Sequence, residues 1–316
     1  MGYKKEPQVF KAKIGEVVIG AGDAAVTIGG ENVWSFYSFD APIEHKPATG
    51  IEFSDKGPDR SLPELAAFYE GAESVADIAA RACTAPGADF VSLILESADP
   101  NGDNIPSEDA AAIAKEAAEA ATAGGKPLVI QTTGNTDKDG ELIPKIAEAA
   151  QGHNVLILAA KEENYKGIAV AAVTAYGQKI GAESAVDINL AKQLNVLIAQ
   201  MGIAPGSCVM QLGNAAAGYG FEYLASTIER VKLAALTQND DTLQMPVIIP
   251  IGSDAWAVKE SLVSEEDFPE WGPREERGIE MEISTAVAAL AAGANAVILR
   301  HPAAVKTVSG MVDQLM

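Results

Sequence analysis

An arginine and a histidine directly follow a short apolar run near the carboxyl terminus. In "GANAVILRHPAAV" the run at 295–299 is followed by Arg300 and His301, whereas His45 and His153 come before apolar runs. Arginine binds carboxylates in a fixed planar geometry, and histidine donates, accepts or carries a proton near neutral pH. Either the two residues belong to a ligand site, or Arg300 pairs with a neighbouring carboxylate while His301 caps a carbonyl group.

Three glutamates, Glu52, Glu96 and Glu183, lie within or at the end of otherwise apolar runs. A buried carboxylate must be paired or must have a raised pKa. These side chains could therefore act as general acids or bases, or they could form a network with Arg300. We favour the network, because the sequence offers no partner nucleophile or cofactor motif beside them.

Residues that would make a metal, redox or nucleophilic centre are scarce. Cys83 and Cys208 are too few for a disulfide framework or for an iron–sulfur cluster held by this chain alone. No two histidines have the spacing of metal ligands, and no serine or cysteine stands beside a base. We therefore expect neither a metal site nor a catalytic residue in this chain.

Other polar residues after the apolar runs are small, hydroxylic or amide-bearing. Such a surface suits a flat ligand that carries amides and is approached closely by the backbone. The alternative is that small residues here only ease the geometry of turns. The residues concerned are Gln131, Thr132, Thr133, Asn135, Gln211, Gly213, Asn214, the stretch "AAAGYG" at 215–220, Ser253, Asp254 and Trp256.

Eight short apolar runs alternate with alanine-rich amphipathic stretches along most of the chain. Runs that are apolar at nearly every position predict strands buried on both faces, as in a parallel sheet covered by helical crossovers. Eight such units predict an α/β fold, a TIM (β/α)8 barrel, whose sites lie at the carboxyl ends of the strands. The fifth run has the weakest pattern. The runs are "GIEFSD" from 50, "FVSLILES" from 90, "PLVIQTTG" from 127, "NVLILAA" from 154, "KIGAESAV" from 179, "CVMQLGN" from 208, "PVIIPIGSDAW" from 246 and "NAVILRHP" from 295.

Residues 1–45 lie outside this repeat. The segments "VFKAKIGEVVIG" and "AAVTIGGENVWSFYSF" alternate like the strands of a hairpin, with Gly29 and Gly30 at a turn. We expect an N-terminal β-hairpin extension at 1–45 that covers the barrel floor or one flank, and a barrel domain at 46–316.

The charge balance of the chain limits its partners. It has 44 acidic and 23 basic residues, a formal net charge of −21, and therefore repels nucleic-acid phosphates and anionic lipid headgroups. No apolar stretch approaches the roughly 20 residues that a bilayer span needs, and "MGYKKEPQVF" lacks the apolar core of a secretion signal. We expect a cytoplasmic protein that binds neither nucleic acid nor membrane.

One long loop, "AVKESLVSEEDFPEWGPREERG", follows the seventh run and precedes the helix expected near Pro273. Ordered loops of this length are commonly functional. Aromatic residues often anchor interfaces, so Trp256, Phe268 and Trp271 favour a partner interface here. The alternative is an acidic insertion whose aromatic side chains fold back on the barrel.

Five stretches together resemble one known family. They are "VTIGGENVWSFYSFDAP", "LESADPNG", "QTTGN", "MQLGNAAAGYG" and "EWGPREERG". The chain resembles, essentially from end to end, the small subunit of the corrinoid iron–sulfur protein, which is equivalent to the delta subunit of archaeal acetyl-CoA decarbonylase/synthase. The resemblance implies a TIM barrel in a heterodimer whose large subunit supplies the iron–sulfur cluster and a corrinoid-binding domain.

The resemblance also implies a methyl carrier of the reductive acetyl-CoA (Wood–Ljungdahl) pathway. The corrinoid would accept a methyl group through methyltetrahydrofolate:corrinoid methyltransferase and pass it to acetyl-CoA synthase. His301 is not part of an Asp-x-His-x-x-Gly corrinoid signature, and that signature occurs nowhere in the chain. We therefore expect the barrel mouth to cover a corrinoid that is anchored in the large subunit.

Seven positions are expected to lie close to this corrinoid, without any cobalt ligand among them. The alternative is a stand-alone barrel methyltransferase that binds a pterin, for which Glu52, Glu96, Asn135 and Asp254 could supply polar groups. The positions expected near the corrinoid are Asn214, Ala215, Ala216, Ala217, Gly218, Asp254 and His301.

Overall fold

Eight parallel strands form the centre of the molecule in the computed structural model, which describes residues 6–316. Their order is β8-β7-β6-β5-β4-β3-β10-β9, and a parallel bridge between Met210 and Val247 joins the two ends of this sheet into a barrel. Every predicted run overlaps one strand, so the TIM-barrel prediction is confirmed. The strands are β3 (Ala48–Ser54), β4 (Phe90–Ile94), β5 (Leu128–Gln131), β6 (Leu156–Ala160), β7 (Lys179–Glu183), β8 (Cys208–Gln211), β9 (Ile248–Pro250) and β10 (Ala296–Leu299).

The fifth barrel strand, β7, shows why its sequence pattern is weak. It pairs with β6 on one side and β8 on the other, and its centre is fully buried. A Cβ atom at Gly181 would lie 2.4 Å from Cδ2 of Leu158, so the packing requires glycine where a β-branched residue would strengthen the pattern.

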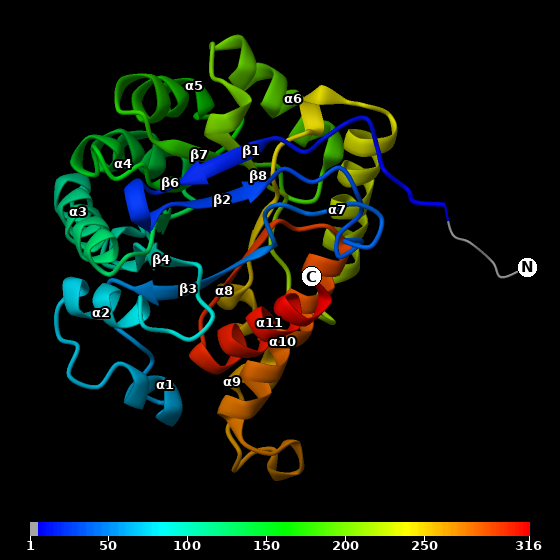
Figure 1. Ribbon diagram of the computed structural model, residues 1–316. Coiled ribbons are helices and arrows are strands. Elements are labelled where there is room, and N and C mark those ends of the chain that lie inside the picture. The colour runs from blue at the N-terminus through cyan, green and yellow to red at the C-terminus, as the bar shows by residue number, and fades with distance from the viewer. Residues whose placement is uncertain (1–5) are drawn as a thin grey trace, which may run out of the picture.

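Helices surround the barrel (Figure 1). They bury small apolar stripes against the sheet: in α3 the side chains of Ala110, Ala114, Ala117 and Ala121 are all fully buried at helical spacing. The α-helices are α1 (Pro63–Phe68), α2 (Val75–Ala82), α3 (Ser107–Ala123), α4 (Thr136–Ala149), α5 (Tyr165–Ile168), α6 (Ile188–Gln200), α7 (Phe221–Thr237), α8 (Gly252–Ala255), α9 (Lys259–Leu262), α10 (Arg274–Ala292) and α11 (Pro302–Leu315). Short 3-10 segments are η1 (Gly22–Ala24), η2 (Glu96–Ala98), η4 (Pro205–Ser207), η5 (Asp241–Leu243) and η6 (Pro269–Trp271), and η3 (Ala169–Ala175) is a π-helical segment.

The N-terminal segment forms an antiparallel hairpin of β1 (Glu16–Ile19) and β2 (Val26–Gly29). The first five residues of the predicted extension lie outside the described residues. We expected the turn between the strands at Gly29 and Gly30. It lies instead at residues 20–25. Gly29 instead ends β2 with a φ of 88°, and a Cβ atom there would lie 2.1 Å from the carbonyl oxygen of Gly15.

This hairpin closes the amino-terminal end of the barrel, its floor, and lies in front of the barrel in Figure 1. Val17, Ile19 and Ile28 are fully buried among side chains of the barrel interior. A backbone hydrogen bond also joins the hairpin to the barrel: Gly20 N–H donates to the carbonyl oxygen of Asn154, just before β6, over 2.8 Å. The hairpin therefore packs against the floor of the barrel.

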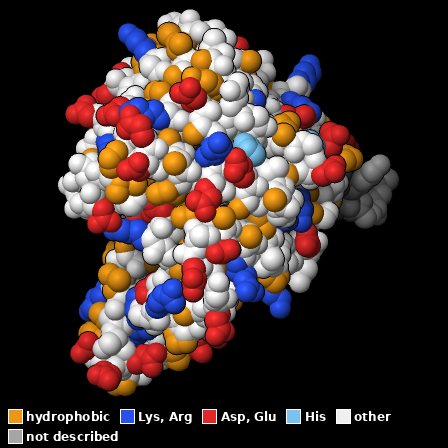
Figure 2. Space-filling model, turned by 90° about the vertical axis from the view of Figure 1, so that its left-hand side faces the viewer, with side chains coloured by type: hydrophobic (Ala, Val, Ile, Leu, Met, Phe, Trp, Pro, Cys, Tyr) orange, Lys and Arg blue, Asp and Glu red, His pale blue; other side chains and the backbone are white. Residues whose placement is uncertain are grey.

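The outer surface carries charges of both signs. Figure 2 shows acidic side chains scattered over one whole side of the molecule, including a narrower lobe at its lower end. No helix within residues 6–316 is long and apolar enough to cross a membrane.

The long loop after β9 contains α9 and η6. Here Trp271 stacks on Phe268 with ring centroids 4.5 Å apart, and the ammonium group of Lys259 lies 4.6 Å from the Phe268 centroid. The aromatic side chains thus contact each other and a neighbouring cation within the loop. A partner interface at Trp271 stays a prediction.

Candidate functional site

The carboxyl ends of the strands surround a hollow at the centre of the mouth, with a volume of about 290 Å³. Threonines, amides and backbone form most of its wall, together with one lysine and one glutamate. We call it the central hollow. Its lining residues are Ile94, Gln131, Thr132, Thr133, Gly134, Leu158, Ala159, Lys161, Glu183, Gln211, Asn214, Pro250 and Ser253.

Arg300, which is half-buried, and the buried Glu52 form an ion pair beside this hollow. Nε and Nη2 of Arg300 lie 2.9 and 2.8 Å from Oε1 of Glu52, whose side chain is fully buried. Gln131 donates to the other carboxylate oxygen and to the Ser92 hydroxyl, each over 3.1 Å. Burial disfavours the charged guanidinium, but the charges of Glu52 and Glu282 and the hydrogen bond to Glu52 together outweigh it and raise the pKa of Arg300. The pairing that we favoured from the sequence is confirmed for Glu52.

The other two glutamates do not join this pair. Glu96 is exposed, and Glu183 faces Lys161, whose Nζ lies 3.6 Å from its Oε2. Burial raises the pKa of Glu183, although the Lys161 charge acts in the opposite direction. The expected network with Arg300 therefore extends to one of the three glutamates as a direct contact.

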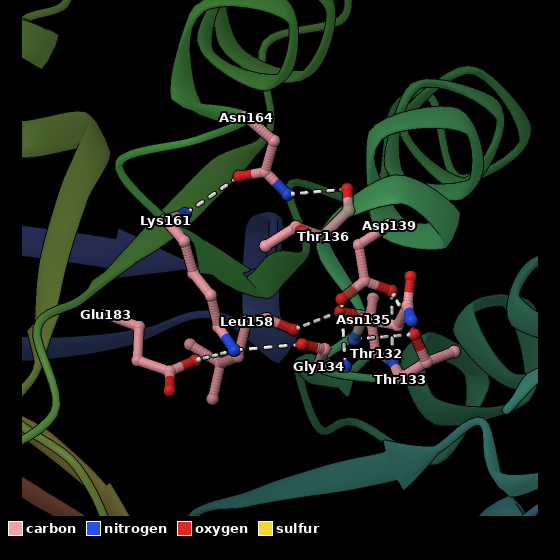
Figure 3. Close-up of polar contacts among 10 residues, drawn as sticks. All are labelled: Thr132, Thr133, Gly134, Asn135, Thr136, Asp139, Leu158, Lys161, Asn164 and Glu183. Atoms are coloured by element: carbon pink, nitrogen blue, oxygen red, sulfur yellow. Dashed lines mark hydrogen bonds and ion pairs between the residues drawn. The ribbon is translucent and has the colours of Figure 1, made fainter. Parts of the chain in front are cut away.

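Lys161 is a residue at the mouth that sequence reasoning missed. It directly follows β6, and its Nζ donates to the carbonyl oxygen of Gly134 over 2.9 Å (Figure 3). The buried Asp139 carboxylate fixes this loop, because it accepts from the backbone N–H groups of Thr133 and Gly134 over 3.0 and 2.9 Å. The position of Lys161 immediately after an apolar run could have indicated from the sequence that it lies at the mouth.

The loop after β8 brings two predicted residues together. Nδ2 of Asn214 donates to Oδ2 of Asp254, so the loops after β8 and β9 are joined. Burial raises the pKa of Asp254, while the Asn214 amide acts in the opposite direction. Ala217 N–H donates to Oγ1 of Thr285 in α10 over 3.0 Å. The loop is thus held from both sides.

The neighbouring loop positions differ in exposure. Ala216 is buried beneath the loop, Ala215 and Ala217 are half-buried, and Gly218 is exposed with a φ of 83°. Nothing lies within 4 Å of a Cβ atom at Gly218, so the space above the loop tip is open.

His301 lies apart from these residues. Its Nδ1 accepts from Ala303 N–H over 3.2 Å and thereby caps α11, and its Nε2 lies 3.2 Å from Oε1 of Glu275. Because Nδ1 is the acceptor, we assign the proton to Nε2. Burial lowers the pKa of His301, although Glu275 acts in the opposite direction. The imidazole thus caps a backbone N–H group and not a carbonyl group, which was the alternative to a ligand site.

Two further expected residues have structural roles. Asn135 caps α4, because its Oδ1 accepts from Lys138 N–H over 3.0 Å. Trp256 is buried against Gly278 of α10. A Cβ atom at position 278 would lie 2.2 Å from the Trp256 ring.

One group of metal-ligand type occurs among residues 6–316, and it lies on the floor. It consists of Glu16, Glu44 and His45, and Lys13 already binds Glu16 over 2.6 Å. Both cysteines are buried, and burial raises the pKa of Cys83 to about 11 and that of Cys208 to about 12. Neither thiol is therefore a thiolate near neutral pH.

The donor set of the central hollow fits an uncharged ligand with hydrogen-bonding groups at its edge. Gln211 is 8% exposed, and its Oε1 is buried without a hydrogen-bond partner among the described residues. Such an orphaned acceptor needs explanation, since the large majority of buried polar side-chain atoms are paired. Lys161 and Glu183 balance each other's charge at the wall. A ligand edge that carries amide groups matches this lining.

The barrel is of the class found in dihydropteroate synthases. The Yersinia pestis enzyme with a pterine-sulfa conjugate aligns with a TM-score of 0.54 at 12% identity, over 85% of this chain and 93% of that one. The Xanthomonas albilineans enzyme with 4-aminobenzoic acid aligns with a TM-score of 0.53 at 14% identity, over the same shares. At such low identity the likeness concerns the fold.

The sequence itself matches a more specific family. The profile described as CO dehydrogenase/acetyl-CoA synthase delta subunit matches residues 16–308. The acetyl-CoA decarbonylase/synthase complex subunit delta of Archaeoglobus fulgidus is 33% identical, over 99% of this chain and 70% of that protein. Subunit delta of Methanocaldococcus jannaschii is 29% identical, over 97% and 72%. The chain therefore belongs to the family of CO dehydrogenase/acetyl-CoA synthase delta subunits.

Proposed function

We propose that this chain is the small subunit of a heterodimeric corrinoid iron–sulfur protein and that its barrel mouth completes the corrinoid site. The observation that carries the proposal is the central hollow: amides, hydroxyls and backbone line it, and Gln211 leaves a buried acceptor unpaired. The relatives of this chain are named as subunits of a complex, which supports the proposal that it binds a partner chain. The large subunit would anchor the corrinoid and hold the iron–sulfur cluster.

The proposed role of this chain is to bind the cofactor's periphery and to exclude solvent. The residues that would hold it are Asn214 to Gly218 and Asp254 at the loops after β8 and β9. Gln211 would supply its unpaired acceptor. His301 would act through Glu275, because both of its ring nitrogens already have partners. When bound, a corrinoid supplies a low-potential cobalt nucleophile that carries a methyl group, and a dry cover protects such a centre.

Further partners follow from this role. We propose that a methyltetrahydrofolate:corrinoid methyltransferase supplies the methyl group and that acetyl-CoA synthase receives it. The proposed location is the cytoplasm. Both enzymes would need access to the same mouth, so the cover must open between the two transfers.

The alternative, a stand-alone methyltransferase that binds a pterin, has one observation in its favour, the likeness of the barrel to dihydropteroate synthases. Two of its four expected ligand groups already have partners, however. Glu52 is satisfied by Arg300 and Gln131, and Asn135 is used as a helix cap. The corrinoid proposal is therefore preferred.

A reconstitution tests the proposal. The chain is co-expressed with its large subunit in a corrinoid-containing host, and the corrinoid that stays with the complex after gel filtration is measured by visible absorption. Asn214 is exposed at the mouth, so Asn214→Trp should lower corrinoid retention severalfold, whereas Leu233→Trp, an exposed position near the carboxyl end of α7, should not.

Two outcomes would reject the proposal. One is equal corrinoid retention in both tryptophan variants. The other is methyl transfer at enzymatic rates by the isolated chain when it is given methyltetrahydrofolate and free cobalamin, since this activity would make it a methyltransferase.

A further inference from the structure

A second hollow of about 190 Å³ lies beside the central hollow, on the side of β3 and β10. Ile94 is the only lining residue that the two hollows share. We call this second space the edge hollow. Its lining residues are Glu52, Phe53, Ser54, Gly57, Pro58, Asp59, Leu65, Tyr69, Ile94, Glu96 and Arg300.

The outer wall of the edge hollow, residues 54–69, is held in place by the start of α10. The Glu275 carboxylate accepts from the backbone N–H groups of Glu64 and Leu65 over 3.0 and 2.9 Å. Nη1 of Arg274 donates to the Ser61 hydroxyl over 2.8 Å. The wall is thus fixed before any ligand arrives, which favours binding.

A buried phenol in this wall lacks a partner. Tyr69 is 4% exposed, and its hydroxyl has no hydrogen-bond partner among residues 6–316. Burial raises the pKa of this hydroxyl well above its ordinary value, and the Glu52 charge adds to the effect. The group is therefore a neutral phenol that can donate one hydrogen bond and accept others.

The charges around the edge hollow select against anions. Glu52 pairs with Arg300 and Asp59 pairs with Arg274, so Glu96 adds one negative charge that has no ion-pair partner among the described residues. A carboxylate or phosphate would therefore be repelled. A small uncharged group that both accepts and donates hydrogen bonds suits the lining, and a primary carboxamide is such a group.

We infer that the edge hollow binds a carboxamide, whose carbonyl oxygen accepts from the Tyr69 hydroxyl and the Arg300 guanidinium and whose amino group donates to the Glu96 carboxylate. The inference rests on the proposed function, because the periphery of a corrin carries carboxamide arms. The amide edge of a pterin presents the same donors and acceptors, so the experiments must separate these two sources.

The first experiment tests the amide chemistry without a corrinoid. The full chain is labelled with 3-fluorotyrosine, and the Tyr69 fluorine resonance is assigned as the one missing in Tyr69→Phe. Titration with propionamide should shift this resonance, and titration with propionate, which has nearly the same shape, should not. No shift with propionamide, or equal shifts with both, would overturn the inference.

The second experiment identifies the source of the amide in the reconstituted complex. Tyr69→Phe removes one hydrogen bond, so the corrinoid should dissociate roughly three- to tenfold faster, as followed by visible absorption after dilution. Tyr165→Phe, a buried tyrosine that does not line the edge hollow, should leave this rate unchanged.

The outcomes separate this inference from the proposed function. If the complex holds corrinoid equally well with and without the Tyr69→Phe change, the corrin assignment is overturned and the proposed function stays intact. A chain that responds to propionamide and to dihydropterin, in a complex that never retains corrinoid, rejects the proposed function and keeps the amide site.

Discussion

His301 connects three elements at the barrel mouth through its two ring nitrogens. Nδ1 accepts from the first turn of α11, and Nε2 contacts Glu275 in α10, whose carboxylate accepts from the start of α1. The imidazole is 1% exposed, so its contribution is to position the wall of the edge hollow. This role differs from direct contact with a cofactor.

Replacing His301 should therefore affect stability more than ligand chemistry. His301→Ala removes the helix cap and the bond to Glu275, and we expect a loss of about 1–3 kcal/mol in the free energy of unfolding, measured in urea. His301→Asn keeps a capping side chain and should lose less. In the reconstituted complex, the cobalt absorption spectrum should be the same for the parent chain and the His301→Ala variant.

Either of two results would contradict this prediction. An unchanged free energy of unfolding in His301→Ala would mean that neither contact contributes to stability. A spectrum that changes from a ligated to an unligated form of cobalt would mean that the imidazole is a cobalt ligand.

The sequence could indicate where His301 lies but not what it contacts. Its position after an apolar run places it at the carboxyl end of β10. Its partner Glu275 comes from the start of a different helix, and no local spacing links the two residues. Likewise, Glu52 is 248 positions away from its partner Arg300, so no local spacing links these two residues either. Such pairs depend on how the barrel closes, which single-strand patterns do not specify.

At the scale of elements, α10 reaches the end of β10 through one buried carboxylate. Glu282 is fully buried and accepts from the backbone N–H groups of Arg300 and His301. Burial raises its pKa to about 7, although these two hydrogen bonds act in the opposite direction. The folded state therefore keeps the proton of Glu282 at pH values where the unfolded chain has released it.

This difference predicts a pH dependence of stability. The pKa in the folded state is raised above the ordinary value of 4.5, so the contribution of Glu282 is fully present below pH 4.5 and is lost as pH rises toward 7. The loss should amount to about 3 kcal/mol at pH 8, at 1.36 kcal/mol for each pKa unit.

Urea unfolding at pH 5 and pH 8 measures this loss by comparison with Glu282→Gln, whose amide does not titrate. The stability difference between the parent chain and the variant should fall by most of that amount between the two pH values. Glu280→Gln, an exposed change on the same helix, should show no such fall. An equal pH dependence for the parent and Glu282→Gln would contradict the prediction.

At the scale of the whole molecule, the eight strands were predictable because each carries its own local pattern of apolar residues between polar loops. The hairpin was predictable as a pair of alternating strands, but its connecting turn was misplaced. Gly29 and Gly30 look like turn residues in sequence, yet the close approach of the Gly15 carbonyl to Gly29 is what requires glycine there. That contact is tertiary, so no local rule could reveal it.

The extension is joined to the barrel by a buried polar cluster. The side chains of Glu31, after β2, and Lys232, in α7, are 7% and 4% exposed and form an ion pair. Asn295, before β10, donates to Glu31 over 2.8 Å and accepts from Lys232 over 2.9 Å. Burial disfavours the charged Glu31, but the Lys232 charge and the hydrogen bonds from Lys232 and Asn295 together outweigh it and lower the pKa of Glu31.

This cluster couples the extension to the barrel, and we expect the two to unfold as one unit. Glu31→Ala leaves the Lys232 charge buried without its partner, and we expect a loss of about 3–5 kcal/mol in the free energy of unfolding. The double variant Glu31→Leu, Lys232→Leu removes both charges and fills the site, so it should lose clearly less than the sum of the two single changes, as a double-mutant cycle in urea would show. One cooperative transition, detected equally by fluorescence and circular dichroism, is expected in every variant. Additive losses, or an early separate transition for the extension, would instead mean that the hairpin is an independent cover on a barrel that is stable without it.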